Sequence, residues 1–211
     1  MRVGNMDGYC GGEPWNAQAV VDGIGFTHLT SQDIWKHHPE KALVVGEKFA
    51  TEREDALKDV MAAVLEAGEW LDTLPNRTEA ANIVGTPEYV NALPAAILPR
   101  LKGEYELGAG LGTKKFKDDY MTFYRDGLVN YPRRSYGHWW LAQYERLGLI
   151  PSAPSGGAAK IVDSLILTDL YESVAAAAKV DVPDDDMKPF TVKLDDVEFD
   201  PAKASAEAKR A

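Results

Sequence analysis

A glycine turn runs directly into a predicted helix near the start of the chain, at Gly11-Gly12-Glu13-Pro14-Trp15-Asn16. Pro14 suits the first position of a helix, where its missing N–H costs nothing, and glycines after Asp22 indicate the helix end. Free backbone N–H groups and the positive end of the helix dipole meet at such a start, which favours an anion. Glu13 opposes this if its carboxylate points into the same space. A plain strand-to-helix turn with Trp15 as packing is the commoner arrangement, because glycine turns before helices are common.

Two short strands are predicted after this helix. The first covers Ile24 to Leu29. The second lies within Lys41 to Phe49, where Ala42-Leu43-Val44-Val45 is apolar and β-branched enough for a buried strand. A lysine that enters a buried strand can hold its ammonium at a cleft as a countercharge for a small anion. A solvated Lys41 at a strand end is the plainer interpretation.

Helices are predicted over much of the remaining chain. Thr51 and Glu54 form a capping-box pair before a run of apolar residues at helical spacing. The other predicted features are a helix opened by Thr86-Pro87, a glycine-rich loop over residues 103–114, a helix over Ser135 to Leu147 with Tyr136, Trp140, Tyr144 and Leu147 on one face, a linker over Pro151 to Gly157, a helix over Ile161 to Ala178, and an extended acidic tail from Asp184. Strands and helices together indicate an α/β fold. The predicted strands are too few for such a fold, because a parallel sheet needs more strands than this chain offers.

Composition and charge narrow the function classes. The 211 residues carry 33 Asp and Glu against 23 Lys and Arg, a net charge of −10, and 45% of them are apolar. The apolar fraction excludes wholesale disorder. A surface with this negative net charge repels phosphate backbones, so no nucleic-acid partner is expected. No apolar run approaches the ~18 residues of a membrane span, so no membrane insertion is expected. The first residues do not resemble a signal peptide.

The histidines and the cysteine give only weak support for a metal site or for nucleophilic catalysis. His37 and His38 are adjacent and therefore point apart on most backbones, and no third ligand stands at a recognisable spacing, so neither a metal nor a cofactor is predicted. The single cysteine, Cys10, excludes an internal disulfide and cysteine-based zinc sites. Cys10 could act as a nucleophile if a histidine activated it. A lone buried cysteine at the end of a strand is the commoner arrangement.

Several motifs in a fixed order resemble the nitrate- and bicarbonate-binding proteins of bacterial ABC transporters. They are Met6-Asp7-Gly8-Tyr9-Cys10 with Gly12-Glu13-Pro14-Trp15-Asn16, Gly23-Ile24-Gly25-Phe26-Thr27, Ser31-Gln32-Asp33-Ile34-Trp35, His38-Pro39-Glu40-Lys41, Met121-Thr122-Phe123-Tyr124-Arg125-Asp126-Gly127 and Asp185-Asp186-Met187-Lys188-Pro189-Phe190. The resemblance covers most of the chain.

The resemblance implies an α/β fold of the type II periplasmic-binding-protein kind, incomplete and helix-rich, of which this chain holds the C-terminal portion. Residues 1–45 would form the end of the second lobe and the hinge crossover. Residues 46–150 would return as a helical segment to the first lobe. Residues 151–211 would form a linker, a helix and the acidic tail.

The same resemblance implies a ligand site for nitrate or a related small anion. Gly12 matches a glycine whose backbone approaches the ligand, and Lys41 matches a hinge residue that contacts it. Glu13, Trp15 and Asn16 are further ligand-binding candidates. A lysine at the hinge position is found in nitrate-binding members, whereas the bicarbonate-binding member has a glutamate that works with calcium. Gly11 departs from the family, which usually has a valine there.

The function implied is a non-enzymatic substrate-binding component of an ABC importer, with the permease and ATPase subunits as partners. Its location would be periplasmic or membrane-associated, or cytoplasmic if the chain is expressed as given. Two alternatives stay open: a cytoplasmic nitrate/nitrite sensor of the same fold, and a hydrolase-type enzyme on that fold using Cys10.

Overall fold

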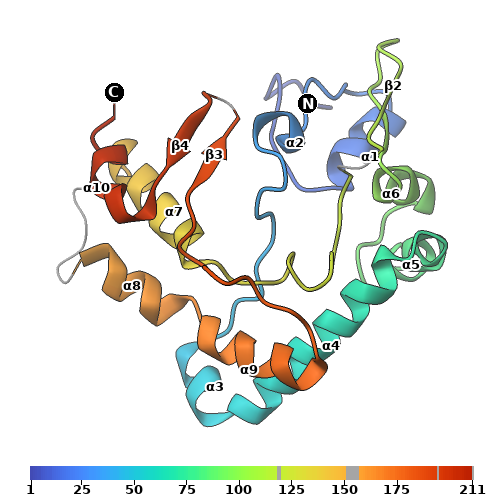
Figure 1. Ribbon diagram of the computed structural model, residues 1–211. Helices are drawn as coiled ribbons and strands as arrows, with labels where there is room; N and C mark the ends of the chain where they lie inside the picture. The colour runs from blue at the N-terminus through green and yellow to red at the C-terminus, as the bar shows by residue number, and fades with distance from the viewer. Residues whose placement is uncertain (118–119, 151–156, 194, 211) are drawn as a thin grey trace. The chain divides into compact units, whose positions relative to one another are not determined.

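The computed structural model describes residues 1–117, 120–150, 157–193 and 195–210 (Figure 1). The described residues are rich in helix and contain two separate antiparallel strand pairs. They fall into two compact units. The first unit consists of Met1–Asp33 and Gly68–Phe123, and the second of Ile34–Ala67 and Tyr124–Ala211. We describe the two units one at a time.

The helices and strands follow one another along the chain. In order they are α1 (Trp15–Val21), α2 (Ser31–Ile34), α3 (Glu47–Glu52), α4 (Glu54–Asp72), α5 (Asn76–Val84), α6 (Pro94–Leu101), β1 (Glu104–Glu106), β2 (Thr113–Lys115), α7 (Arg134–Arg146), α8 (Gly157–Leu165), α9 (Thr168–Ala178), β3 (Phe190–Val192), β4 (Val197–Phe199), the 3-10 turn η1 (Pro201–Lys203) and α10 (Ala204–Glu207).

In the first unit, α6 packs against α1, α5 and β1, and α1 also packs against β1. Its apolar centre is formed by Ala81, Ala92 and Ile97. A fully buried arginine, Arg77, ties the surrounding loops together, because its guanidinium donates to the carbonyls of three separate segments and pairs with Asp72. Burial lowers the pKa of Arg77, and the Asp72 carboxylate opposes that shift. A buried cation with this many acceptors is fully satisfied.

The second unit has an apolar core and an aromatic cluster. Its apolar core joins Leu65 of α4 to Tyr131 and to one face of α9, formed by Tyr171, Val174 and Ala175. The aromatic cluster surrounds Trp35. Its ring stacks on Phe190 with centroids 5.0 Å apart and an interplanar angle of 9°, and it also contacts Tyr136 and Trp139 of α7. Trp35 therefore fixes the chain just after α2 to elements far along the sequence.

Several helices are where the sequence predicts them. The helix after the glycine turn is α1, followed by Gly23 at φ 66°. The helix predicted over Ser135 to Leu147 is α7, followed by Gly148 at φ 70°. The apolar helix after residue 51 is α4, with Leu57 and Leu65 buried.

Both predicted strands in the first fifty residues are wrong. Ile24 to Leu29 is irregular: the Ile24 N–H donates to the carbonyl of Ala19, and the Thr27 N–H donates to the carbonyl of Leu107. Lys41 to Gly46 is irregular too, and Val44 is 82% exposed. The reason is the same in both cases: a strand is stable only beside other strands, and among the described residues the strands pair only with each other.

Two predicted helix starts are also wrong. Thr51 lies inside α3, and its hydroxyl donates back to the carbonyls of Glu47 and Lys48 instead of capping α4. The pair Thr86-Pro87 forms a turn, in which the Thr86 hydroxyl donates to the carbonyl of Ile83 and so closes α5. The next helix, α6, begins at Pro94.

The predicted apolar face of α7 is wrong as well. Trp140 and Tyr144 are 45% and 40% exposed, whereas the buried face carries His138, Ala142 and Gln143. This polar face is covered by α10, whose buried Glu207 accepts a hydrogen bond from the Gln143 side chain, 2.8 Å away. Burial lowers the pKa of His138, and Asp163 and Asp186 act in the opposite direction.

Three further segments differ from the sequence prediction. Residues 103–114 contain β1 and the start of β2, with Gly108, Gly110 and Gly112 in the connection between them. The helix predicted over 161–178 is two helices, α8 and α9, and the buried Thr168 hydroxyl at the start of α9 donates to the carbonyl of Pro132. The acidic tail folds: β3 pairs with β4 in the register Phe190↔Phe199 and Val192↔Val197, and Phe199 is buried.

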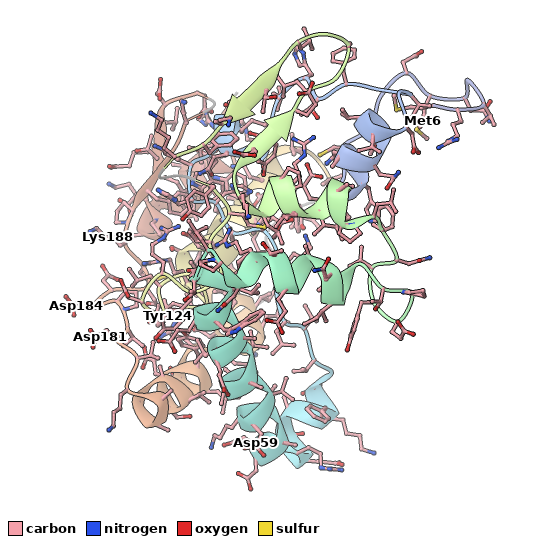
Figure 2. The ribbon with its side chains drawn as sticks, turned by 90° about the vertical axis from the view of Figure 1, so that its right-hand side faces the viewer. Met6, Asp59, Tyr124, Asp181, Asp184 and Lys188 are labelled. Carbon is pink, nitrogen blue, oxygen red and sulfur yellow. The ribbon has the colours of Figure 1, made fainter. Side chains whose placement is uncertain are left out.

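The acidic run Asp184-Asp185-Asp186, on which the extended tail was predicted, lies in the connection between α9 and β3. Asp184 is exposed, with its side chain directed away from the ribbon (Figure 2), whereas Asp186 accepts a hydrogen bond from the Arg134 side chain of α7. The linker predicted over Pro151 to Gly157 falls, except for Gly157, outside the described residues. The assignment of segments to two lobes stays a prediction. No described helix is long and apolar enough to cross a membrane.

Candidate functional site

The glycine turn before α1 is held by its own side chains. The Trp15 N–H donates to the carbonyl of Gly12 over 3.3 Å, the Asn16 side-chain amide donates to the carbonyl of Gly11, and the Tyr9 hydroxyl donates to the carbonyl of Trp15 over 2.8 Å. Gly11 and Gly12 are exposed, and no described residue accepts the Gly12 N–H. The turn therefore presents this N–H as a free backbone donor.

Glu13 is turned away from the exposed side of the turn and into the first unit. Its carboxylate accepts the Ala17 N–H of α1 over 3.1 Å and lies 3.5 Å from Nε of Arg100. Arg100 is 3% exposed, and its Nη2 donates to the Thr27 hydroxyl and to the carbonyl of Glu106. The guanidinium also lies 4.3 Å from the centre of the Tyr105 ring. Glu13 is therefore a helix cap with a buried counter-ion.

Trp15 is 51% exposed, so the interpretation of Trp15 as a packed residue inside a turn is wrong. Its ring helps to line a shallow, apolar pocket of about 370 Å³ together with Met6, Tyr9, Ala19 and Ile24. Figure 2 shows Met6 in the loop that precedes α1. Burial raises the pKa of the Tyr9 phenol, and the Glu13 carboxylate adds to that shift. An apolar wall of this kind does not suit a hydrated inorganic anion.

Lys41 belongs to the second unit and lies in the irregular segment between α2 and α3. Its side chain is 71% exposed and forms an ion pair with Glu40. The preceding residues are fixed, because Trp35 is stacked in the aromatic cluster and His38 Nδ1 lies 2.8 Å from the carbonyl of Trp35. Lys41 is therefore a solvated lysine in an irregular segment, and the prediction that it enters a buried strand is wrong.

Cys10 is exposed, so the expectation of a buried cysteine at a strand end is wrong. The catalytic alternative requires a histidine within hydrogen-bond reach. In its own unit the sequence offers His28, and no hydrogen bond joins the two side chains in the described structure. Among the described residues, no group of three or more His, Cys, Asp or Glu could hold a metal ion.

Four of the five predicted site residues therefore belong to one turn. Gly12, Glu13, Trp15 and Asn16 lie in the first unit, and Lys41 lies in the second. Sequence reasoning missed Arg100, the buried cation behind the turn. No local signal identifies it, because its importance comes from Glu13, 87 positions earlier in the chain, and only the fold brings the two together.

Comparisons with known proteins agree with the fold. The NrtA-type nitrate/nitrite-binding protein of Nostoc sp. is 33% identical over 206 residues, covering 96% of this chain and 46% of that protein. The bicarbonate-binding protein CmpA of Synechococcus elongatus is 28% identical over 207 residues, covering 95% of this chain and 45% of that protein. The chain thus spans about half the length of these relatives.

A solved structure matches almost the whole chain. The crystal structure of the periplasmic nitrate-binding protein NrtA from Synechocystis PCC 6803 superposes with a TM-score of 0.90 at 30% sequence identity, covering 98% of this chain and 54% of that one. Residues 1–85 also match the NMT1-like family.

The fold is therefore a partial periplasmic-binding-protein-like fold, helix-rich and with few strands. Almost the whole chain is thus similar to about half of the NrtA-like nitrate- and bicarbonate-binding proteins. The names of these relatives describe binding proteins, for nitrate and nitrite in one case and for bicarbonate in the other.

Proposed function

We propose that this chain forms part of the substrate-binding component of an ABC importer, with nitrate or a similar small inorganic anion as its ligand. The observation that carries the proposal is the identity of 33% with the nitrate/nitrite-binding protein of Nostoc sp. over 96% of the chain. The identity with the bicarbonate-binding relative is lower, at 28%. The permease and ATPase subunits are its proposed partners, and a periplasmic or membrane-associated location follows from the same proposal.

The glycine turn supplies the first proposed contact. Gly12 offers an exposed backbone N–H, and nitrate accepts hydrogen bonds through its oxygen atoms. The Glu13 carboxylate, which would repel an anion, is already engaged by Ala17 and Arg100. Asn16 supports the turn through Gly11 and is proposed to position it. Trp15 lines the apolar pocket and is left out of the proposed contact.

Lys41 supplies the second proposed contact. Its ion pair with Glu40 is exposed at both ends, and such pairs contribute about 1 kcal/mol or less, so an anion can replace the carboxylate at little cost. An ammonium is a compact point charge, which suits a small, permanently charged anion and requires no metal.

The test is calorimetric titration of nitrate, nitrite and bicarbonate into a chimera. In the chimera, residues 1–211 replace the matched part of Synechocystis NrtA, an exchange that the TM-score of 0.90 supports. Lys41→Glu is the test variant. Lys48→Glu is its matched control, because Lys48 is also an exposed lysine of the second unit and lies only seven residues further along the chain.

Nitrate binding by the chimera and by the Lys48→Glu variant, with loss of at least about 100-fold in affinity for Lys41→Glu, supports the proposal. A chimera that unfolds cooperatively but ignores all three anions overturns it. Equal nitrate affinity for Lys41→Glu and wild type removes Lys41 from the site.

A further inference from the structure

Glu13 is the one charged residue in the turn Gly11–Asn16, and it directly follows the proposed anion contact at Gly12. Like charges repel each other strongly over the few ångströms that separate neighbouring residues. A carboxylate on the exposed side of this turn would therefore oppose nitrate, whichever backbone N–H groups the turn offers. In the structure the Glu13 side chain is 17% exposed and is directed into the first unit instead.

Two groups hold the Glu13 carboxylate in that position. One is local, because the Ala17 N–H of α1 donates to Oε2 over 3.1 Å. The other comes from α6, which lies beside α1 (Figure 1): Nε of Arg100 is 3.5 Å from Oε1. A single backbone N–H does not compensate a carboxylate for its lost hydration, whereas a cation in contact with it offsets much of that loss. We therefore expect the inward position of Glu13 to depend on Arg100.

Arg100 is itself fixed on its other sides. Its side chain is 3% exposed, and Nη2 donates to the Thr27 hydroxyl over 3.3 Å and to the carbonyl of Glu106 over 3.1 Å. Nη1 is buried and has no hydrogen-bond acceptor among the described residues. A buried guanidinium held in this way cannot follow a carboxylate to the surface, and the loss of its counter-ion is costly. The place of Arg100 in the fold therefore decides where the Glu13 carboxylate lies.

We propose that Arg100 is a positioning residue of the anion site, which holds the Glu13 carboxylate away from the ligand and so lets the turn accept an anion. Arg100 acts through Glu13 and does not contact the ligand. The inference rests on the proposed function, since it requires an anion at Gly12, and it adds a residue of α6 that sets the charge of the ligand. Removal of Arg100 alone should make Glu13 repulsive, and removal of both charges should restore the site.

The test is a double-mutant cycle in the chimera with Synechocystis NrtA, measured by calorimetric titration of nitrate. The variants are Arg100→Met, Glu13→Gln and the two combined. Arg100→Lys is the conservative variant, because it keeps the positive charge. Lys102→Met is the matched control, because it also removes a cation at the end of α6, at an exposed position. Urea unfolding of every variant identifies the conditions in which it is folded, and affinities are compared there.

Arg100→Met should weaken nitrate binding by at least about tenfold, whereas Arg100→Lys and Lys102→Met should weaken it by about threefold or less. Adding Glu13→Gln to Arg100→Met should return the affinity to within about threefold of wild type, because the uncharged amide does not repel the anion. The ratio of the wild-type and Arg100→Met affinities should fall by about twofold or more when NaCl is raised from about 0.01 M to about 0.15 M. Salt screens a repulsion between charges, and a loss of packing alone would leave this ratio unchanged.

Nitrate binding by wild type, with equal affinity for Arg100→Met, overturns this inference and leaves the proposed function standing. A loss of affinity that Glu13→Gln does not restore, or that is independent of salt, overturns it too and makes Arg100 a structural residue. If Arg100→Met does not fold, the combined variant and Arg100→Lys decide, and nitrate binding more than about tenfold weaker than wild type in either one contradicts the inference. A wild-type chimera that ignores nitrate overturns the proposed function and this inference together.

Discussion

The turn at Gly11–Asn16 is held by its own side chains and by Arg100 of α6, whereas the segment from Lys41 to Gly46 is exposed along most of its length. Both regions were singled out from the sequence as ligand contacts. In the turn, backbone donors are positioned by hydrogen bonds already present. At Lys41 the charge is solvated, and the chain around it has no partner strand among the described residues. Substitutions in the turn should therefore change stability, and substitutions at Lys41 should change ligand binding alone.

The largest expected effect is that of Arg100→Met. This change keeps an unbranched apolar stem but removes the guanidinium, which leaves Glu13 without its counter-ion. Removing one member of a largely buried pair lowers the free energy of unfolding by about 3 kcal/mol. Urea unfolding measures the loss. Lys102→Met, at an exposed position two residues further on, should cost less than about 0.5 kcal/mol. Equal losses for the two variants would contradict the role given to Arg100.

The second expected effect is a loss of stability at alkaline pH that originates in the second unit. Burial raises the pKa of the Tyr171 phenol to about 12 from an ordinary value of 10.0, and its hydroxyl donates to the carbonyl of Gly127. The folded state holds this proton more tightly than the unfolded state. Its contribution is therefore fully present below pH 10 and is lost as the pH rises to about 12, by about 2–3 kcal/mol.

Tyr171→Phe tests this origin. The variant should be less stable than wild type at neutral pH, because the Gly127 carbonyl loses its donor. Its free energy of unfolding should fall less steeply between pH 10 and pH 12. Unfolding in urea at a series of pH values gives both slopes, and identical slopes would show that Tyr171 does not cause the loss.

Trp35→Ala is expected to have a smaller effect of about 2 kcal/mol, because Trp35 is only half-buried although it contacts three aromatic rings. It should also free the chain before Lys41, which faster hydrogen exchange at His38 would reveal. Trp140→Ala is the control, since Trp140 is 45% exposed on α7. Unchanged exchange at His38 would mean that the aromatic cluster does not anchor the Lys41 segment.

The smallest expected effect on stability is that of Lys41→Met. An exposed ion pair with Glu40 contributes little, so the free energy of unfolding should change by less than about 0.5 kcal/mol. The same variant should bind nitrate at least about tenfold more weakly in the chimera. A large loss of stability with unchanged binding would reverse the roles that we assign to the two regions.

The sequence predicts elements whose stability is local. The helices α1, α4 and α7 were predicted because apolar spacing and the glycines after α1 and α7 act within a few residues. The predicted strand at Ala42–Val45 was wrong because β-pairing requires a neighbouring strand, and none of the described strands pairs with it. Arg100 was missed for a related reason, because its partners Glu13 and Thr27 come from distant segments.

The most direct test of the central claim is nuclear magnetic resonance of the chimera during a nitrate titration. Labelled glycine reports the Gly12 amide, and labelled lysine reports the Lys41 ammonium. Because both groups are proposed to bind the same ion, both signals should shift and give the same dissociation constant. Two different constants, or a shift at neither group, would contradict the assignment of this turn and this lysine to one anion site.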